Sequence, residues 1–159
     1  MTKLGLWRSA RQVALILWLL AAPGAAAHAA LQSSEPAAGA AVTADVTEVT
    51  LTFTEGIEAL FSTFKLFRLD AEVDLNAANA ELRLNGLAAV LVNRYLGSQE
   101  VGEGQVVIEL VTDRADRTTV VLRPLEPLAP GHYVAMWRVL SADTHVVDGQ
   151  FVFTVLPVD

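Results

Sequence analysis

Hydrophobic and polar residues alternate along most of the chain beyond residue 45, which is the period expected of half-buried β-strands. In "EVTLTFT", residues 48–54, Val49, Leu51 and Phe53 fall on one face and the threonines fall on the other. Further β-rich runs cover 62–69, 105–112, 118–125, 133–140 and 149–155. Short strands separated by turn signals predict an all-β sandwich.

Two turns accompany this pattern. Pro36 and Gly39 in "SSEPAAGAAV" predict a turn before the first long strand. In "LAPGHY", residues 128–133, a Pro-Gly turn precedes a strand that opens at His132 or Tyr133. Tyr133 is therefore a candidate for the tyrosine corner of immunoglobulin-like folds, in which the phenol bonds to upstream backbone. The alternative is a turn followed by an ordinary core tyrosine.

Residues 71–105 interrupt the strand pattern and predict one inserted helix at about 76–96. Apolar residues recur there at steps of three and four, at Ala77, Ala80, Leu84, Leu87, Leu91 and Tyr95. Asn85-Gly86 is also a hairpin signal, so a hairpin is the alternative. A helix in a long sandwich connection is expected to cover an open edge or end of a sheet.

Residues 1–27 have the three parts of a Sec-type export signal. They comprise a basic start, an apolar stretch over 13–22 that is short for a membrane span, and small residues at 25–27. We predict a leader that is cleaved after Ala27 and a single extracytoplasmic domain of residues 28–159. An uncleaved membrane anchor is the alternative.

The predicted mature domain is strongly acidic. Removing the leader takes away Lys3, Arg8 and Arg11, which leaves 8 of the 11 basic residues against 18 acidic ones, a formal net charge of −10. This charge argues against nucleic acid and anionic membranes as partners and favours cations. The chain has no cysteine, so a metal site must use nitrogen and oxygen ligands. Because the common hydrolase and phosphate-binding motifs are also absent from the sequence, we predict a binding protein and not an enzyme.

Three residues are candidate metal ligands. Cleavage after Ala27 would make His28 the first residue, whose amine and imidazole Nδ1 could chelate one ion. In an extended segment Asp143 and His145 would point to the same side, adding one nitrogen and one carboxylate oxygen. This set suits Cu(II). The alternatives are a histidine that follows the cleavage site by chance and an ordinary solvated turn.

Four stretches of the chain resemble the CopC-type (CopC/YobA) copper-resistance proteins of the bacterial periplasm. They are "AHAALQSSEPAAGAAV", "VTEVTLTFTEGIEALFSTFKL", "LAPGHYVAMWRVLSADTHVVDG" and "GQFVFTV". The resemblance implies a Greek-key β-sandwich that binds one Cu(II) through residues matching His28, Asp143 and His145. It also places a glutamate near the metal, here Glu55, as a second-shell or weak ligand; an ordinary exposed acid is the alternative. The implied partners are copper and a copper-handling protein, such as an inner-membrane copper importer.

The chain also departs from the family pattern. Residues 71–105 exceed the compact family form, so the helix inherits no role. Some members hold Cu(I) in a methionine-rich stretch, but only Met136 remains after cleavage, so no such site is expected. His132 lacks the spacing of the candidate ligands and is expected to be a plain surface residue. Two rival functions are an oxidative copper enzyme with a histidine-brace site and a metal-free immunoglobulin-like interaction module.

Overall fold

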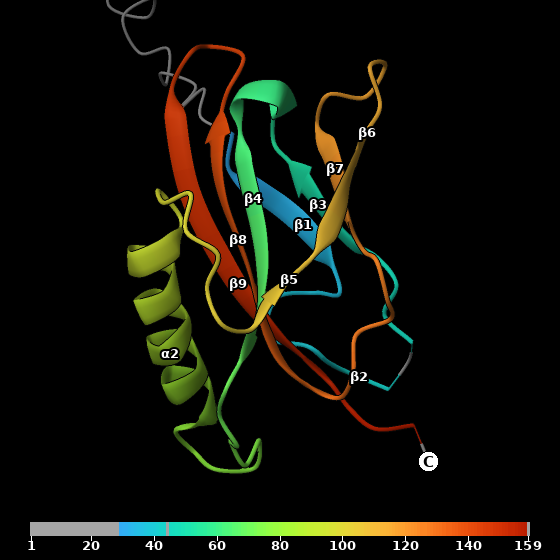
Figure 1. Ribbon diagram of the computed structural model, residues 1–159. Coiled ribbons are helices and arrows are strands. Elements are labelled where there is room, and N and C mark those ends of the chain that lie inside the picture. The colour runs from blue at the N-terminus through green and yellow to red at the C-terminus, as the bar shows by residue number, and fades with distance from the viewer. Residues whose placement is uncertain (1–28, 44, 159) are drawn as a thin grey trace, which may run out of the picture.

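Two β-sheets packed face to face form the protein in the computed structural model, which describes residues 29–43 and 45–158 (Figure 1). The first sheet has the strand order β1 (Leu31–Glu35), β3 (Val49–Phe53), β7 (Thr119–Pro124) and β6 (Ile108–Thr112). The second has the order β2 (Ala41–Val42), β9 (Val146–Val155), β8 (Gly131–Leu140), β4 (Thr63–Leu69) and β5 (Gln105–Val106). All strand pairs described are antiparallel except β2 with β9. The predicted sandwich is confirmed.

The alternating residues form the core between the sheets. Val49, Leu51 and Phe53 of β3 are almost completely buried, as their alternation predicts. Alternate residues of β8 and β9 face them from the second sheet, among them Trp137 and Phe151. Phe53 and Trp137 meet edge to face with ring centroids 5.9 Å apart. Burial of apolar side chains from both sheets therefore holds the sandwich together.

Tyr133 forms the predicted tyrosine corner. Its phenol donates a hydrogen bond of 2.7 Å to the backbone oxygen of Ala129, four residues upstream. The ring is buried and stacks against Phe153, with centroids 5.6 Å apart. The bond ties the turn that precedes β8 to the start of that strand.

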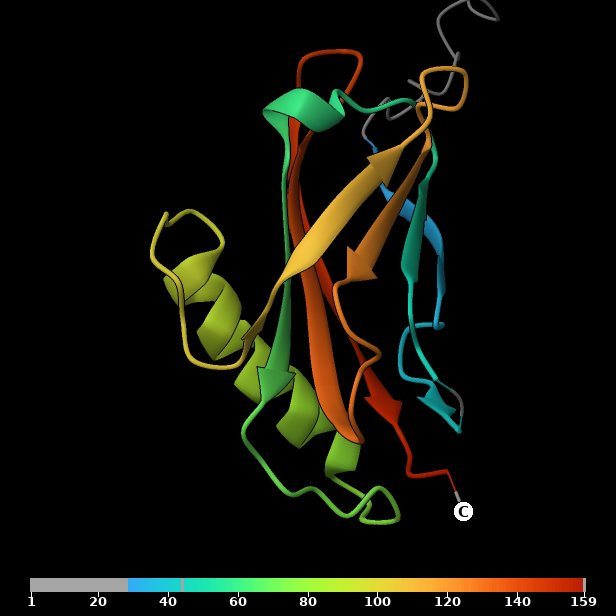
Figure 2. The same cartoon turned by 45° about the vertical axis from the view of Figure 1, so that its right-hand side comes forward.

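The inserted helix, α2 (Ala80–Tyr95), packs on the outer face of the five-stranded sheet (Figure 2). The expectation that it covers a sheet edge or end is therefore wrong. Strands β8 and β9 also carry apolar residues on their outer face, including Val134, Met136 and Val152, and the helix shields these from water. Its buried residues are Ala80, Leu84, Ala88 and Tyr95, whereas Leu87 is 38% exposed.

His132 is also placed differently from the prediction, because it is buried and not on the surface. Only 8% of the residue is exposed, and its Nδ1 lies 2.8 Å from the Thr154 hydroxyl. Position 132 shares the outer face of β8 with Val134 and Met136, the face that the inserted segment covers. Burial lowers the pKa of the imidazole, although a hydrogen bond with the Val73 backbone opposes this.

The predicted leader, residues 1–27, and His28 lie outside the described residues. Within residues 29–43 and 45–158, no helix is long and apolar enough to span a membrane.

Candidate metal centre

The loop between β8 and β9 holds two of the predicted ligands. The Ser141 amide donates to the His145 carbonyl over 2.9 Å, and the Thr144 amide donates to the Ser141 carbonyl over 2.9 Å. Thr144 has a φ of 74°, in the left-handed region that closes the turn. Residues 141–145 thus form a tight hairpin turn and not the extended segment assumed from the sequence.

This turn brings Asp143 and His145 together. The imidazole Nδ1 of His145 lies 2.9 Å from Oδ2 of Asp143, and the His145 amide donates to Oδ1 over 3.2 Å. The side chain of His145 is 61% exposed and that of Asp143 is 27% exposed. A carboxylate and an imidazole are therefore adjacent at an accessible end of the sandwich.

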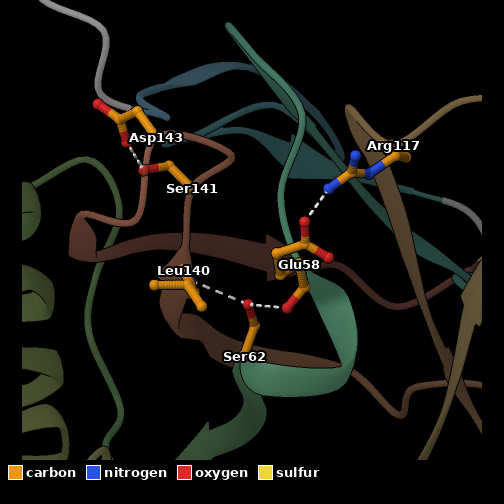
Figure 3. Close-up of polar contacts among 6 residues, drawn as sticks. All are labelled: Glu58, Ser62, Arg117, Leu140, Ser141 and Asp143. Atoms are coloured by element: carbon orange, nitrogen blue, oxygen red, sulfur yellow. Dashed lines mark hydrogen bonds and ion pairs between the residues drawn. The ribbon is translucent and has the colours of Figure 1, made fainter.

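Ser141 supports the Asp143–His145 pair from the interior of the protein. The residue is 1% exposed, and its hydroxyl donates a hydrogen bond to Oδ1 of Asp143 (Figure 3). That bond is the main reason that the pKa of Asp143 is lowered to about 2; bonds and charge from His145 add to the effect, while burial opposes it. At neutral pH Asp143 is therefore a carboxylate, which is the form that binds a cation.

Backbone bonds fix the base of the turn against the segment after β3. The Ala142 amide donates to the Gly56 carbonyl over 3.0 Å, and Ile57 forms an isolated antiparallel bridge with Ser141. The Glu58 amide donates to the Leu140 carbonyl over 2.8 Å. The last residue of β8 and the start of the turn are thus held by a neighbouring chain segment.

Side chains add to this support at the short 3-10 helix η1 (Ala59–Phe61) (Figure 3). The Ser62 hydroxyl donates to the Glu58 carbonyl over 2.8 Å and accepts from the Leu140 amide over 3.1 Å. An ion pair between Glu58 and Arg117 connects this region to the loop between β6 and β7. Three loops therefore meet at the end of the sandwich that carries Asp143 and His145.

The start of the described chain lies at the same end. The Ala30 amide donates to the Thr54 hydroxyl over 3.1 Å, and the Thr54 amide donates to the Ala30 carbonyl over 2.9 Å. Ala29 is completely buried in the core. Thr54 is two residues before Gly56, whose carbonyl accepts from Ala142, so Ala30 is bonded to the same chain segment that holds the turn.

Glu55 lies between Thr54 and Gly56 and is partly buried. Its Oε1 is buried and has no hydrogen-bond partner among the described residues. Glu55 is therefore not fully exposed, since this oxygen is shielded from water. A buried acceptor without a donor is costly, and a cation or donor nearby would offset that cost.

Two of the three predicted ligands are adjacent, and the third, His28, lies outside the described residues. Among the residues that the structure describes, no cluster of three or more His, Cys, Asp or Glu suited to a metal is found. Ser141 is not among the residues that were predicted for the site. A signal was present, because alternation through Trp137 and Val139 places Ser141 on the buried face, where a polar residue needs a partner.

The fold and this turn define a class of small β-sandwich proteins with a carboxylate and an imidazole at one end. A CopC domain model matches residues 31–94 and 87–156, two segments that overlap within α2. The chain belongs to the CopC family.

Relatives with known names agree with this family. Copper resistance protein C of Escherichia coli is 30% identical over 82% of this chain and 83% of its own length. Protein YobA of Escherichia coli K12 is 29% identical over 90% of each chain.

Solved structures of the family share the fold. CopC from Methylosinus trichosporium OB3b aligns with a TM-score of 0.57 and 25% identity, over 83% of this chain and 97% of its own. PcoC, a methionine-rich copper resistance protein from Escherichia coli, aligns with a TM-score of 0.56 and 29% identity, over 81% and 99% of the two chains.

Proposed function

We propose that this protein is an exported Cu(II)-binding protein of copper resistance or homeostasis, which sequesters or delivers one copper ion. The observation that carries the proposal is the adjacent Asp143 carboxylate and His145 imidazole on a turn braced by its neighbours. The names of the relatives, copper resistance protein C and PcoC, support copper as the cation. Nitrogen and oxygen donors of this kind are the set that Cu(II) prefers.

The proposed ligands are the amine and imidazole of His28 together with Asp143 and His145. The placement of Ala29 and Ala30 beside the segment that contacts the turn supports the contribution of residue 28. Glu55 is the proposed second-shell residue, since its buried oxygen lacks a donor among the described residues. Met136 is fully buried beneath α2 and does not contribute a thioether to this end of the protein.

The described surface favours binding over oxidative catalysis. Of the aromatic side chains that the structure describes, only Phe61 is strongly exposed, at 77%. A polysaccharide-oxidising enzyme with a histidine-brace site would need a broader exposed aromatic face. We therefore propose a protein without catalytic turnover.

The proposed location is the periplasm, after Sec-type export and removal of residues 1–27. The domain of residues 28–159 would then exchange copper with a copper-handling partner, such as an inner-membrane importer. Its formal net charge of −10, from 8 basic and 18 acidic residues after the leader is removed, would raise the local concentration of cations.

A copper titration followed by EPR tests the proposal on two purified forms. One form begins at His28, and the control carries a single alanine before His28. The form that begins at His28 is expected to show a nitrogen-rich tetragonal Cu(II) signal, and the extended form is expected to bind much more weakly because its imidazole and terminal amine no longer belong to one residue. Equal affinity of the two forms would exclude the N-terminal chelate.

A further inference from the structure

The side chain of Ser141 lies where the two proposed ligands of the β8–β9 turn meet. Its hydroxyl donates to Oδ1 of Asp143 and lies 2.9 Å from the backbone oxygen of His145. Its amide donates to the same His145 oxygen over 2.9 Å. Ser141 is 1% exposed, so the hydroxyl is held inside the fold while the ligand side chains reach outward.

These contacts give the two oxygens of Asp143 different roles. Oδ1 accepts from the Ser141 hydroxyl and from the His145 amide, both within the turn. Oδ2 is turned toward the imidazole, 2.9 Å from Nδ1 of His145. The rotation of the carboxylate is therefore fixed by the two donors at Oδ1 together with the contact of Oδ2 with the imidazole.

We propose that Ser141 is a positioning residue for copper binding, which retains Oδ1 of Asp143 and so presents Oδ2 as a single-oxygen ligand beside His145. This inference rests on the proposed function. A carboxylate oriented before the ion arrives loses less rotational freedom when it binds, so the hydroxyl raises affinity without touching the metal.

Ser62 offers a matched control, because removing its hydroxyl should weaken the fold at this end without affecting the proposed ligands directly. Its hydroxyl also braces the end of β8, and its hydrogen bonds go to the Glu58 carbonyl and the Leu140 amide. Ser62→Ala therefore removes a supporting hydroxyl that is bonded to Leu140, the residue before Ser141, while the hydrogen bond from Ser141 to Asp143 remains.

The test compares Ser141→Ala, Ser62→Ala and the unaltered protein, each beginning at His28. Cu(II) affinity is measured by competition with a chelator, the copper signal by EPR, and the stability of the copper-free form by thermal unfolding. Ser141→Ala is expected to lose about 10- to 100-fold in affinity, the range for loss of an outer-shell partner, and to change the EPR parameters. Ser62→Ala is expected to unfold at a lower temperature with unchanged affinity and EPR signal.

A double-mutant cycle separates positioning from general disturbance of the turn. If Ser141 acts through Asp143, Ser141→Ala should have no further effect on affinity once Asp143→Ala is present. Ser141→Thr, which keeps the hydroxyl, should recover most of the affinity. If Ser141→Ala does not fold, Ser141→Gly removes the same hydroxyl and replaces it in every comparison.

Three outcomes would overturn the inference: an unchanged affinity and EPR signal in Ser141→Ala, an equal affinity loss in Ser62→Ala, or an undiminished effect of Ser141→Ala in the Asp143→Ala background. His145→Ala distinguishes these from failure of the proposed function. If His145→Ala binds copper as the unaltered protein does, the proposed site itself is wrong. If it loses copper while Ser141→Ala keeps it, only the positioning role is wrong.

Discussion

Replacing Tyr133 with phenylalanine removes one hydroxyl from the tyrosine corner and leaves the core otherwise unchanged. The ring is 2% exposed and stacks against Phe153, and phenylalanine can keep both the burial and the stacking. What is lost is the 2.7 Å hydrogen bond from the phenol to the Ala129 carbonyl. The change therefore isolates a single bond between the turn before β8 and that strand.

The structure sets the expected size of the effect. A buried neutral hydrogen bond contributes about 0.5–1.5 kcal/mol, and more is lost when the remaining partner stays buried and unpaired. Ala129 is exposed, so its carbonyl can bond to water after the substitution. We therefore expect Tyr133→Phe to lower the free energy of unfolding by about 1 kcal/mol and not by the larger penalty of an orphaned group.

Urea denaturation of the copper-free domain measures this change. The midpoint should fall while the dependence on urea concentration stays the same, because the surface exposed on unfolding is nearly unchanged. Tyr133→Leu serves as a control that also loses the ring and should destabilise the domain more. An unchanged midpoint in Tyr133→Phe, or a loss as large as that of Tyr133→Leu, would show that the corner bond does not act as described.

Three further predictions concern the helix, the buried histidine and the candidate ligands. Leu84→Ala should lower the free energy of unfolding by about 2–4 kcal/mol, because Leu84 is 7% exposed on the face of α2 that packs on the sheet. Leu87→Ala, at a 38% exposed position of the same helix, should cost less than about 1 kcal/mol, and chemical denaturation of both variants checks which helix face is buried. Burial lowers the pKa of His132, so below the ordinary value of about 6.5 the unfolded state binds more protons than the folded state, and the free energy of unfolding should fall as the pH drops. His132→Gln should lose less stability between pH 7.5 and 5.5 in the same assay. Because the pKa of Asp143 is about 2, its charge is constant between about pH 4 and 8, and the loss of copper affinity in acid should come from protonation of the imidazole and amine groups. Asp143→Ala should therefore bind copper more weakly at every pH, with the same dependence of affinity on pH in copper titrations, and a changed dependence would contradict this.

The sequence by itself determined the sandwich and the inserted helix. Alternation such as that of Val49, Leu51 and Phe53 is a local property of a strand with one buried face, so it can be recognised without knowing the partner strands. The same holds for the helical period, which predicted a helix at 76–96 where the structure has one at Ala80–Tyr95. The resemblance to the CopC family was likewise carried by local motifs and is confirmed.

Only the tertiary structure decided which face the helix covers and how the turn is held. The burial of His132 depends on the inserted segment lying over β8, a contact between parts of the chain that no local pattern specifies. Asp143 and His145 were identified from their spacing, but Thr144 in the left-handed region and the Ser141 hydroxyl bring them together in a turn. Local periodicity indicates which residues become buried. The partners of a buried hydroxyl or imidazole, in contrast, depend on segments that come into contact only after folding.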